Sequence, residues 1–456
     1  MVIADSPFLP ARGGGEREHL GFVRAAVAAE RLGLLVVPSS EPLAVEPYRE
    51  LLGDVPLLVT RRRESKLLLA RPVQPYVVSS RPVQSGLVER VRELVPSVTG
   101  VVVFSYKSWR IGEAVAKGLD VPAVLRQHNL EGAYHRSLAQ GTKGPRGLVL
   151  HVEARRIERD ERRLECAAWL RTMADISATD AEVRRKRGGR AVHVPPFAYD
   201  ASLLALHRDP DPNPRVLFLG ALDVTTNATA LDWLLEGVWP SVRARVPGAV
   251  LDVVGRGPSE ALRKRLLGEP GVLLHADVPD IHPYLAGASV AVNPAVSGSG
   301  VNIKLVDYLQ AGVPVVTTTL GVQGLGLTDS GSLVVRDDPR SFGEALAALL
   351  KDREHAEAMG VSGRKRIAEL LDPVSNILRL EAELMTPPKA PPASPPVPVR
   401  RSRWRSRTST SSQLPAARSG TRSMRARPVW PTPSVQRSGW RPGTATSPGL
   451  PTDTSS

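Results

Sequence analysis

The sequence predicts an α/β protein with two Rossmann-like, doubly wound domains that face a cleft, followed by a disordered C-terminal tail. Short apolar segments alternate with longer helical patterns through most of the 456 residues, which is typical of parallel sheets with helices on both faces. The alternation stops at LHRDPDPNPR, residues 206–215, where three prolines indicate a linker, and then begins again. From residue 386 the composition changes abruptly to Pro, Ser, Thr and Arg.

The first domain is expected over residues 1–207. Its strands are predicted at Leu34–Pro38, Gly100–Phe104, Val121–His128 and Ala191–Pro195. Its helices are predicted at Glu16–Leu32, Val83–Leu94, Ile111–Leu119 and the long charged stretch His151–Met173.

The second domain is expected over residues 208–372. Its strands are predicted at Arg215–Leu219, Val250–Val254, Val272–His275, Val290–Asn293, Val313–Thr317 and Leu333–Arg336. Its helices are predicted at Ala228–Arg245, Pro258–Leu267, Pro279–Gly287, Ile303–Ala311, Pro339–Lys351 and Arg353–Leu370. A last amphipathic helix, Pro373–Glu383 within residues 373–385, closes the folded part. Ligands of doubly wound sheets bind beyond the carboxyl ends of strands, so the functional residues should follow strands.

The tail, residues 386–456, holds twelve Lys and Arg and one acid, Asp453, so it carries +11 of the formal net charge of +14. It has few large aliphatic residues and cannot bury enough surface to offset the loss of chain entropy, which predicts disorder. A solvated tail, a tether to an anionic surface and a translation of the wrong reading frame are three interpretations. The other 385 residues carry +3 (14 − 11), so no nucleic acid partner is expected for the folded part.

Cysteine content and hydropathy predict a cytoplasmic location. Cys166 is the single cysteine, which excludes an intrachain disulfide and fits a reducing compartment. No stretch has the roughly 18–20 apolar residues of a membrane span, and the first residues do not resemble a secretory signal. A peripheral contact with the inner face of the membrane is left open, and the oligomeric state is unknown.

The stretch SGSGVNIKLVDYLQAG, residues 297–312, places small residues between a strand and a helix. Glycines let a ligand approach the backbone, and the free N–H groups and dipole of a helix N-terminus attract phosphate. Lys304 adds a positive charge, and Asp307 lies on the same helical face. These features favour a diphosphate on the loop and Lys304, with ribose hydroxyls on Asp307. The alternative is a flexible turn with an exposed Lys–Asp pair.

Six further positions lie at expected strand ends or before a helix. Gly220 ends one strand, and Gly255 with Arg256 ends another, although a tight turn would explain the same G-x-G. Gly14 and Gly15 precede the first helix, in a loop that lacks both common phosphate-binding patterns. His128 ends the strand before a helix, where it would hold or polarise a substrate, or serve as a structural histidine. Paired cysteines and H-E-x-x-H are absent from the sequence, so no metal site is predicted.

Two segments resemble a known family. RVLFLGALDVTTNATALDWLLEG and GVLLHADVPDIHPYLAGASVAVNPAVSGSGVNIKLVDYLQAGVPVVTTTLGVQGL look like the donor-binding half of retaining glycosyltransferases of family four, which have the GT-B fold. The resemblance is most specific over roughly residues 215–370 and weaker in the first domain, where VLRQHNLEGAYHRSLA is similar to family members. It ends at the tail.

The resemblance implies an enzyme that transfers a sugar from a nucleotide diphosphate sugar to an acceptor glycan, lipid or small molecule, with retained configuration. It implies no metal and no cofactor, because a helix dipole and cations stabilise the leaving diphosphate. Catalytic roles fall to His128 and Lys304. The donor-binding positions are Gly14, Gly15, Gly220, Gly255, Arg256, Ser299, Gly300, Val301, Asn302, Ile303 and Asp307.

This sequence departs from the family pattern in two places. Ser299 stands where the family has the first acid of its Glu-x7-Glu motif, of which Asp307 is the second acid. The segment after the first strand of the second domain lacks the usual Arg and Lys, so Lys304 with Arg256 would have to stabilise the leaving group. Two alternatives therefore stay open: a GT-B-fold epimerase of nucleotide sugars, and a nucleotide-sugar-binding protein without activity.

Overall fold

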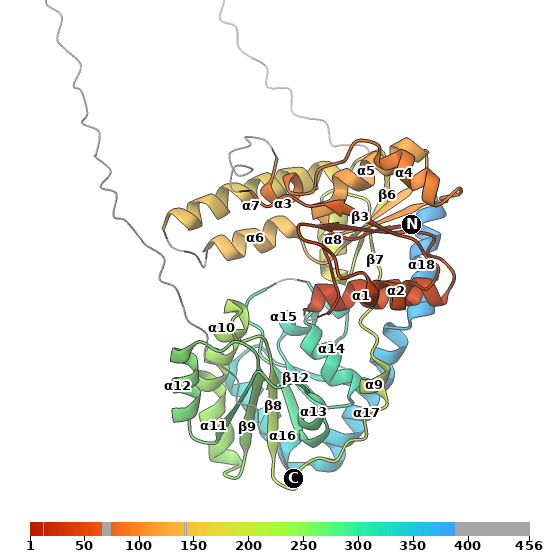
Figure 1. The fold of residues 1–456 in the computed structure, drawn as a ribbon. Helices are drawn as coiled ribbons and strands as arrows, with labels where there is room; N and C mark the ends of the chain where they lie inside the picture. Colours follow the sequence, from red (N-terminus) through yellow and green to blue (C-terminus); the bar gives the residue numbers. More distant parts are fainter. Residues whose placement is uncertain are drawn as a thin grey trace, which may run out of the picture. The chain divides into compact units, whose positions relative to one another are not determined.

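A computed structural model describes residues 1–11, 13–65, 74–140, 142, 144–298, 300–329 and 331–387. Ser299 and almost all of the expected tail lie outside the described residues. The chain forms two parallel sheets, each covered by helices, as the alternating sequence pattern predicts (Figure 1). The expected α/β class with two doubly wound sheets is therefore confirmed.

The first sheet has the strand order β3-β2-β1-β4-β5-β6-β7, and all its paired strands are parallel. Its strands are β1 (Val2–Ile3), β2 (Leu35–Ser39), β3 (Leu57–Arg61), β4 (Val101–Phe104), β5 (Ala123–Gln127), β6 (Leu170–Asp175) and β7 (Ala191–His193). Its helices are α1 (Gly14–Ala28), α2 (Glu46–Leu52), α3 (Tyr76–Ser79), α4 (Leu87–Leu94), α5 (Trp109–Leu119), α6 (Glu131–Gln140), α7 (Pro145–Leu164), α8 (Ala178–Lys186) and α9 (Ala201–Leu204).

The second sheet has the order β10-β9-β8-β11-β12-β13 and is also parallel. Its strands are β8 (Arg215–Leu219), β9 (Val250–Gly255), β10 (Val272–Ala276), β11 (Val290–Asn293), β12 (Val315–Thr317) and β13 (Val334–Val335). The helices that follow are α10 (Thr225–Trp233), α11 (Trp239–Arg245), α12 (Glu260–Gly268), α13 (His282–Gly287), α14 (Ile303–Gln310), α15 (Thr319–Val322), α16 (Pro339–Lys351), α17 (Arg353–Leu370) and α18 (Pro373–Met385). In both sheets the order reverses beside the first strand, which opens a crevice at the carboxyl ends.

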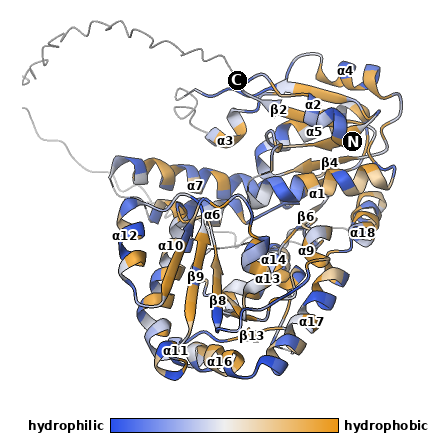
Figure 2. Ribbon diagram, turned by 60° about the horizontal axis from the view of Figure 1, so that its bottom comes forward, coloured by the Kyte–Doolittle hydropathy of each residue, from blue (hydrophilic) through white to orange (hydrophobic). Residues whose placement is uncertain are grey.

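The strands of both sheets are hydrophobic, as Figure 2 shows for β8 and β9. Phe218 on β8 and Val253 on β9 are fully buried, and they belong to one continuous core with residues of α10, α11 and α16. Burial on both faces explains why these strands read as continuous apolar runs rather than alternating ones.

One predicted element is wrong in part. The stretch His151–Met173 does not form a single helix, because α7 ends at Leu164 and β6 begins at Leu170. The charge of α7 masked the start of the strand, whose Leu170 and Met173 are buried in the core of the first sheet. Strands β1 and β3 were also not predicted, and β1 is only two residues long.

The last helix, α18, returns to the first sheet. It follows α17, which packs against α14, but α18 itself packs against α1, β5 and β6. Its Ile377, Leu380 and Leu384 are buried in the apolar core that also contains β2 and β4 residues. The closing helix predicted from the sequence therefore belongs structurally to the first sheet.

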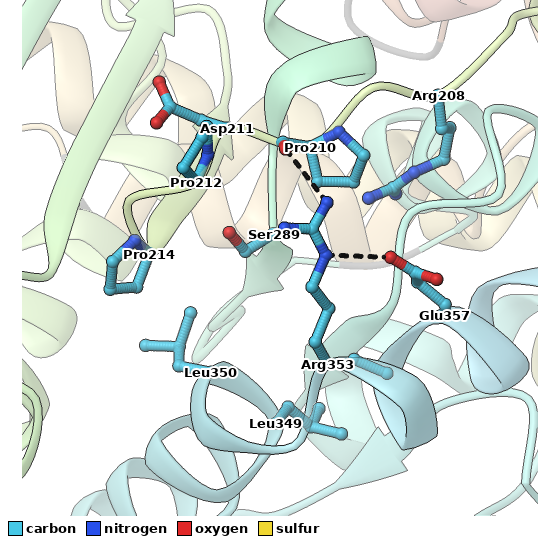
Figure 3. A pocket seen from close by; sticks show the side chains of 11 residues that line it. Arg208, Pro210, Asp211, Pro212, Pro214, Ser289, Leu349, Leu350, Arg353 and Glu357 are labelled. Atoms are coloured by element: carbon cyan, nitrogen blue, oxygen red, sulfur yellow. Dashed lines mark hydrogen bonds and ion pairs between the residues drawn. The ribbon is translucent and has the colours of Figure 1, made fainter.

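The proline-rich stretch before β8 runs over the surface of the second sheet's helices. Figure 3 shows the small cavity beside it, about 60 Å³, between this stretch and α16–α17. Arg353 donates to the carbonyl of Pro210 at 3.1 Å and to Glu357 at 3.0 Å, which fixes the stretch to the start of α17. These contacts hold a segment that forms no regular hydrogen-bonded structure of its own.

Candidate functional site

A cavity of about 560 Å³ lies at the carboxyl ends of the strands of the second sheet. Its walls come from the β8–α10 and β9–α12 loops, the start of α14 and the start of α1. Among its lining residues are Gly14, Gly220, Gly255, Arg256, Val301, Asn302, Ile303, Lys304 and Asp307. Nine of the positions singled out from the sequence thus line one cavity.

Lys304 projects into this cavity from the first turn of α14. Its Nζ donates to Asn227 Oδ1 at 2.7 Å and lies 4.6 Å from the ring centroid of Phe218. Burial lowers the pKa of Lys304 to about 8. No carboxylate pairs with Lys304 in the part of the chain that the structure describes, so a positive charge is held in the cavity by a neutral amide and an aromatic face.

The N-terminus of α14 opens on the same cavity. Asn302 is the N-cap residue, but its side chain makes no capping bond and instead donates to the carbonyl of Gly321 at 3.3 Å. Val301, Asn302 and Ile303 all line the cavity. The first N–H groups of a helix have no intrahelical acceptor, so this end of α14 can bind an anion.

Two glycines permit close backbone contacts around the cavity. A Cβ on Gly255 would lie 1.8 Å from the carbonyl oxygen of Gly220, so the ends of β8 and β9 approach only because residue 255 has no side chain. A Cβ on Gly14 would lie 2.7 Å from the side chain of Ile303, which brings the start of α1 against the start of α14. The sequence predicted both glycines as donor-binding positions, and in the structure both stand where a side chain would prevent a close contact.

Asp307 has a different partner from the one the sequence predicts. It is buried, and it accepts two hydrogen bonds from Arg17 of α1, at 2.9 and 2.8 Å. Burial raises the pKa of Asp307, although Arg17 opposes the shift. Asp307 and Lys304 share a helix turn but are not paired with each other, which excludes the simple exposed Lys–Asp pair. The ribose-binding role of Asp307 would require Arg17 to move.

A second cavity of about 410 Å³ adjoins the first and is lined by residues of both sheets. Gly14, Val301 and Ile303 line both cavities. The second cavity adds His128 at the end of β5 and Gly15, whose Cβ would meet the His128 ring at 3.6 Å. Gly15 therefore lies beside His128 and not in the cavity with Lys304.

His128 is a half-buried histidine whose pKa is shifted toward the neutral form. Burial holds its pKa well below the ordinary value, and the nearby His19 acts in the same direction. Its Nε2 is buried and has no hydrogen-bond partner among the described residues. An unpaired buried polar atom is costly unless a ligand meets it, so His128 is suited to hydrogen-bonding a substrate hydroxyl.

Charged residues surround His128. Asp5 follows β1 and pairs with Lys107 at 3.0 Å. Burial opposes ionisation of Asp5, but Lys107, His19 and Arg81 hold its pKa far below the ordinary range. Lys107 also lines the second cavity, together with Glu131, whose pKa is raised by burial. The second cavity can thus offer both a cation and hydrogen-bond acceptors to a polar ligand.

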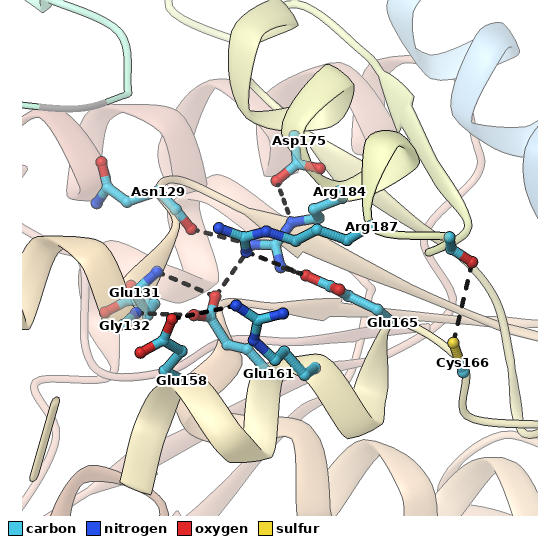
Figure 4. A network of polar contacts seen from close by, with 12 residues as sticks. Asn129, Glu131, Gly132, Glu158, Glu161, Glu165, Cys166, Asp175, Arg184 and Arg187 are labelled. Carbon is cyan, nitrogen blue, oxygen red and sulfur yellow. Dashed lines mark hydrogen bonds and ion pairs between the residues drawn. The ribbon is translucent and has the colours of Figure 1, made fainter. Parts of the chain in front are cut away.

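A buried network fixes the loop that carries His128. Arg184 of α8 pairs with Asp175 at 3.0 Å and with Glu161 and Glu165 at 3.1 Å, and it donates to the carbonyl of Asn129 (Figure 4). Glu161 in turn accepts from the backbone N–H groups of residues 131 and 132 at the start of α6. The network therefore holds both sides of the turn that follows His128.

Gly300 brings the loop before α14 against the loop that carries His128, although it is not a lining residue of either cavity. It adopts φ +78°, and a Cβ there would lie 2.3 Å from Asn129 Oδ1 and 2.8 Å from the carbonyl oxygen of His128. Only glycine both tolerates that backbone conformation and leaves room for the neighbouring loop.

Arg17, Asn227 and Lys107 are site residues that sequence reasoning did not identify as such. Asn227 lies in the polar segment after β8, where the sequence shows no cation. Arg17 lies one turn after Gly14 on α1, so its position beside a glycine loop was the available signal. Its pairing with Asp307, 290 positions away, has no local signal at all.

Residues 213–352 match the model of a family described as Glycosyl transferases group 1. These residues form a group 1 glycosyl transferase domain. The domain contributes Gly220, Gly255, Lys304 and Asp307 to the first cavity, so most of that cavity's wall belongs to the matched segment. The family resemblance inferred from the sequence is confirmed at the level of group 1. Retention, and membership of family four in particular, stay predictions.

Curated relatives are similar to part of the chain. The chain is 29% identical over 186 residues to an uncharacterized 44.6 kDa protein in the cps region of Klebsiella pneumoniae, covering 39% of this chain and 44% of that protein. It is 30% identical over 140 residues to a GDP-mannose-dependent alpha-(1-6)-phosphatidylinositol monomannoside mannosyltransferase of Mycobacterium tuberculosis, covering 28% and 36%. The chain spans less than half the length of these curated relatives.

Solved structures match a larger part of the chain. The crystal structure of Anabaena Alr3699/HepE in complex with UDP superposes with a TM-score of 0.58 at 14% identity, covering 84% of this chain and 98% of that one. At this identity the likeness concerns the fold alone. It confirms the GT-B architecture, in which the group 1 domain is accompanied by a second Rossmann-like sheet.

Proposed function

We propose that the protein is a glycosyltransferase that moves a sugar from a nucleotide diphosphate sugar to an acceptor. The observation that carries the proposal is the pair of adjoining cavities. One contains Lys304, which has no carboxylate partner among the described residues, and the other contains His128, whose Nε2 has no hydrogen-bond partner in that part of the chain. A donor that occupies the first cavity would present its sugar near Gly14, Val301 and Ile303, which line both.

In this proposal the diphosphate binds at the start of α14. Lys304, the free N–H groups of the helix and the exposed Arg256 would share its negative charge. Asp307 would release Arg17 and accept hydrogen bonds from the ribose. The mycobacterial relative is named as GDP-mannose-dependent and the Anabaena structure contains UDP, which supports a nucleoside diphosphate as the leaving group.

The proposed reaction breaks the bond between the sugar's anomeric carbon and the diphosphate oxygen, which keeps the electron pair. An acceptor hydroxyl in the second cavity forms the new bond to that carbon, and its proton passes to the departing diphosphate oxygen. The charge that develops on the diphosphate is stabilised where Lys304 and the α14 dipole already lie, so no metal ion is needed. In the described part of the chain, no group of three or more His, Cys, Asp or Glu side chains is placed to hold a metal. Retention, and a glycan, lipid or small-molecule acceptor, are further parts of the proposal.

The test begins with binding. Isothermal titration with UDP, GDP and ADP should identify a ligand of the native protein, and Lys304→Met should weaken its affinity by about tenfold or more, as expected for a lost charge-assisted hydrogen bond. Lys264→Met, an exposed lysine on α12, is the matched control and should bind like the native protein. Equal affinity of Lys304→Met and native protein for every nucleotide would refute the donor site.

Turnover then separates the alternatives. Release of the bound nucleoside diphosphate from its sugar, dependent on an added acceptor, supports a transferase. Conversion of the nucleotide sugar without any acceptor indicates the epimerase, and tight binding without turnover across a broad acceptor panel indicates the inactive binding protein.

A further inference from the structure

The outer face of α7 combines exposed apolar and basic side chains. Leu148, Val149 and Val152 are 70%, 44% and 40% exposed, which is unusual for large aliphatic residues on one helix. Arg155, Arg159 and Arg163 are exposed on the following turns. We call these six residues the outer face of α7. Residues 148, 152, 155 and 159 follow the spacing of one helical stripe, so the apolar half and the basic half point in a common direction.

The acids of α7 lie elsewhere, and each has a partner inside the first sheet's helical layer. Glu153 accepts from the backbone N–H of Tyr76 at 2.7 Å, and Asp160 accepts from the hydroxyl of Tyr106 at 2.7 Å. Glu161 is buried with Arg184, and Glu158 pairs with Arg136 of α6. The balanced charge of α7 in the sequence is therefore separated in space.

The arginines of the outer face are uncompensated. Among the described residues, Arg155, Arg159 and Arg163 have no carboxylate within ion-pair distance, whereas Arg156 and Arg162 on neighbouring positions pair with Glu153 and Glu158. A surface with aliphatic side chains beside unpaired arginines matches a bilayer interface, where apolar groups enter the acyl boundary and cations meet anionic headgroups.

We propose that the outer face of α7 docks on the surface of an anionic lipid bilayer. The helix would lie in the interface, with Leu148, Val149 and Val152 inserted and the three arginines on the headgroup phosphates. No helix of the described residues is long and apolar enough to cross a membrane, so the contact proposed is with one leaflet surface. The inference is independent of the proposed catalytic activity, because it rests only on the exposed side chains of α7.

The partner helix α6 connects this surface with the second cavity. It packs along α7 as a helical hairpin (Figure 1), and its Tyr134 and His135 line the cavity that contains His128. A bilayer held against α7 would thus lie beside the element that forms one wall of the second cavity.

The experiment is co-sedimentation of the full chain with sucrose-loaded vesicles of phosphatidylcholine alone or with about 30% phosphatidylglycerol. The native protein should bind the mixed vesicles and bind the neutral ones much more weakly. The double variant Arg155→Glu, Arg159→Glu should lower the partition coefficient about tenfold or more. The double variant Leu148→Ser, Val152→Ser should lower it several-fold, since the inserted aliphatic surface is lost.

Matched controls come from exposed positions of α17 and α18. Lys365→Glu with Arg366→Glu makes the same change in net charge, and Val361→Ser with Val374→Ser removes similarly exposed valines. Both should partition like the native protein, and all variants should keep the native melting temperature within about 2 °C, as expected for exposed positions.

Three outcomes would overturn the proposal. The first is equal vesicle binding by the α7 variants and native protein, which would place the contact elsewhere in the chain. The second is a loss with the arginine variant but not with the serine variant, which would indicate a site for a soluble polyanion. The third is a native dimer, seen by sedimentation velocity without lipid, that the serine variant dissociates, because the face would then be covered by a second copy of this chain.

Discussion

Lys304 is a half-buried positive charge that is available to an anion. Its pKa is lowered to about 8 because the site removes water without supplying a carboxylate. A diphosphate placed beside it would favour the charged form and raise that pKa again. The proton that Lys304 loses in the free protein above pH 8 must therefore be taken up when the ligand binds.

This linkage predicts a pH-dependent affinity for the nucleotide. Below about pH 8, Lys304 is charged in both the free and the bound protein, so the affinity for the nucleotide should not change with pH. Above about pH 8, the affinity for the nucleotide should fall by up to about tenfold per pH unit, because binding must take up a proton. Isothermal titration with the best nucleoside diphosphate between pH 7 and about 9.5 measures the slope, and buffers of different ionisation enthalpy report the proton uptake. Lys304→Met should bind weakly with no such slope. A native affinity that stays flat above pH 9 would contradict the assignment.

The residues of the site were predicted to different degrees. Glycines, Lys304 and His128 follow strands, and local sequence was sufficient to find them because the carboxyl ends of parallel strands converge. The partner of Asp307 was not predictable, because Arg17 belongs to the other sheet and ion pairing across 290 positions leaves no periodic pattern. The same reason explains why the sequence could not show that Asn227 holds Lys304.

At the scale of elements, the second sheet was easier to predict than the first. Strands β8 and β11 begin and end as predicted, because apolar runs there are bounded by Pro, Gly or Ser. In the first sheet, β6 was assigned to a helix because arginines and acids continue almost to its start. Its neighbour α7 looked like a solvated helix in the sequence, and only the three-dimensional arrangement separates its inward acids from its outward arginines.

The loop between β5 and α6 depends on Arg184 of α8. Three carboxylates surround this guanidinium, and burial raises the pKa of Asp175 and Glu165 despite the ion pairs. Arg184→Met would leave Asp175 and Glu161 buried without this cation, and Glu165 with Arg187 alone at 3.8 Å. The variant should lower the free energy of unfolding by about 3–5 kcal/mol. Arg185→Met changes an exposed neighbour on the same helix and is the control. It should change the free energy of unfolding little.

The loss of stability caused by Arg184→Met should depend on pH, and the raised pKa values of the acids fix its direction. Without the cation, the folded-state pKa values of Asp175 and Glu165 rise further above their unfolded values. The folded state then binds more protons, and the loss of stability shrinks as pH falls through those pKa values. Melting temperatures of native and variant protein should therefore differ more at pH 8 than at pH 5.5. A difference that is constant over this range would mean that the network does not carry the charges assigned to it.

At the scale of the whole molecule, α17 and α18 connect the two sheets. Helix α17 packs against α14 and α16, and after Leu371 and Asp372 the chain continues into α18, which packs on α1, β5 and β6. The core of the first sheet therefore includes side chains from the end of the described chain. A Cβ on Gly100, just before the central strand β4, would lie 2.4 Å from Leu384, so α18 contacts the start of this strand without an intervening side chain.

This connection predicts that α18 stabilises the first sheet. Leu380→Ala and Leu384→Ala each remove a buried side chain from its core and should each lower the free energy of unfolding by about 2–5 kcal/mol. Leu378→Ala on the same helix is the matched control, because its side chain is 53% exposed and should cost less than about 1 kcal/mol. Differential scanning calorimetry with and without a nucleotide ligand distinguishes the unfolding of the two sheets. The ligand should raise the melting temperature of the transition that contains Lys304. The Leu380 and Leu384 variants should lower the melting temperature of the first sheet. If these two variants and Leu378→Ala melted alike, α18 would not belong to that core.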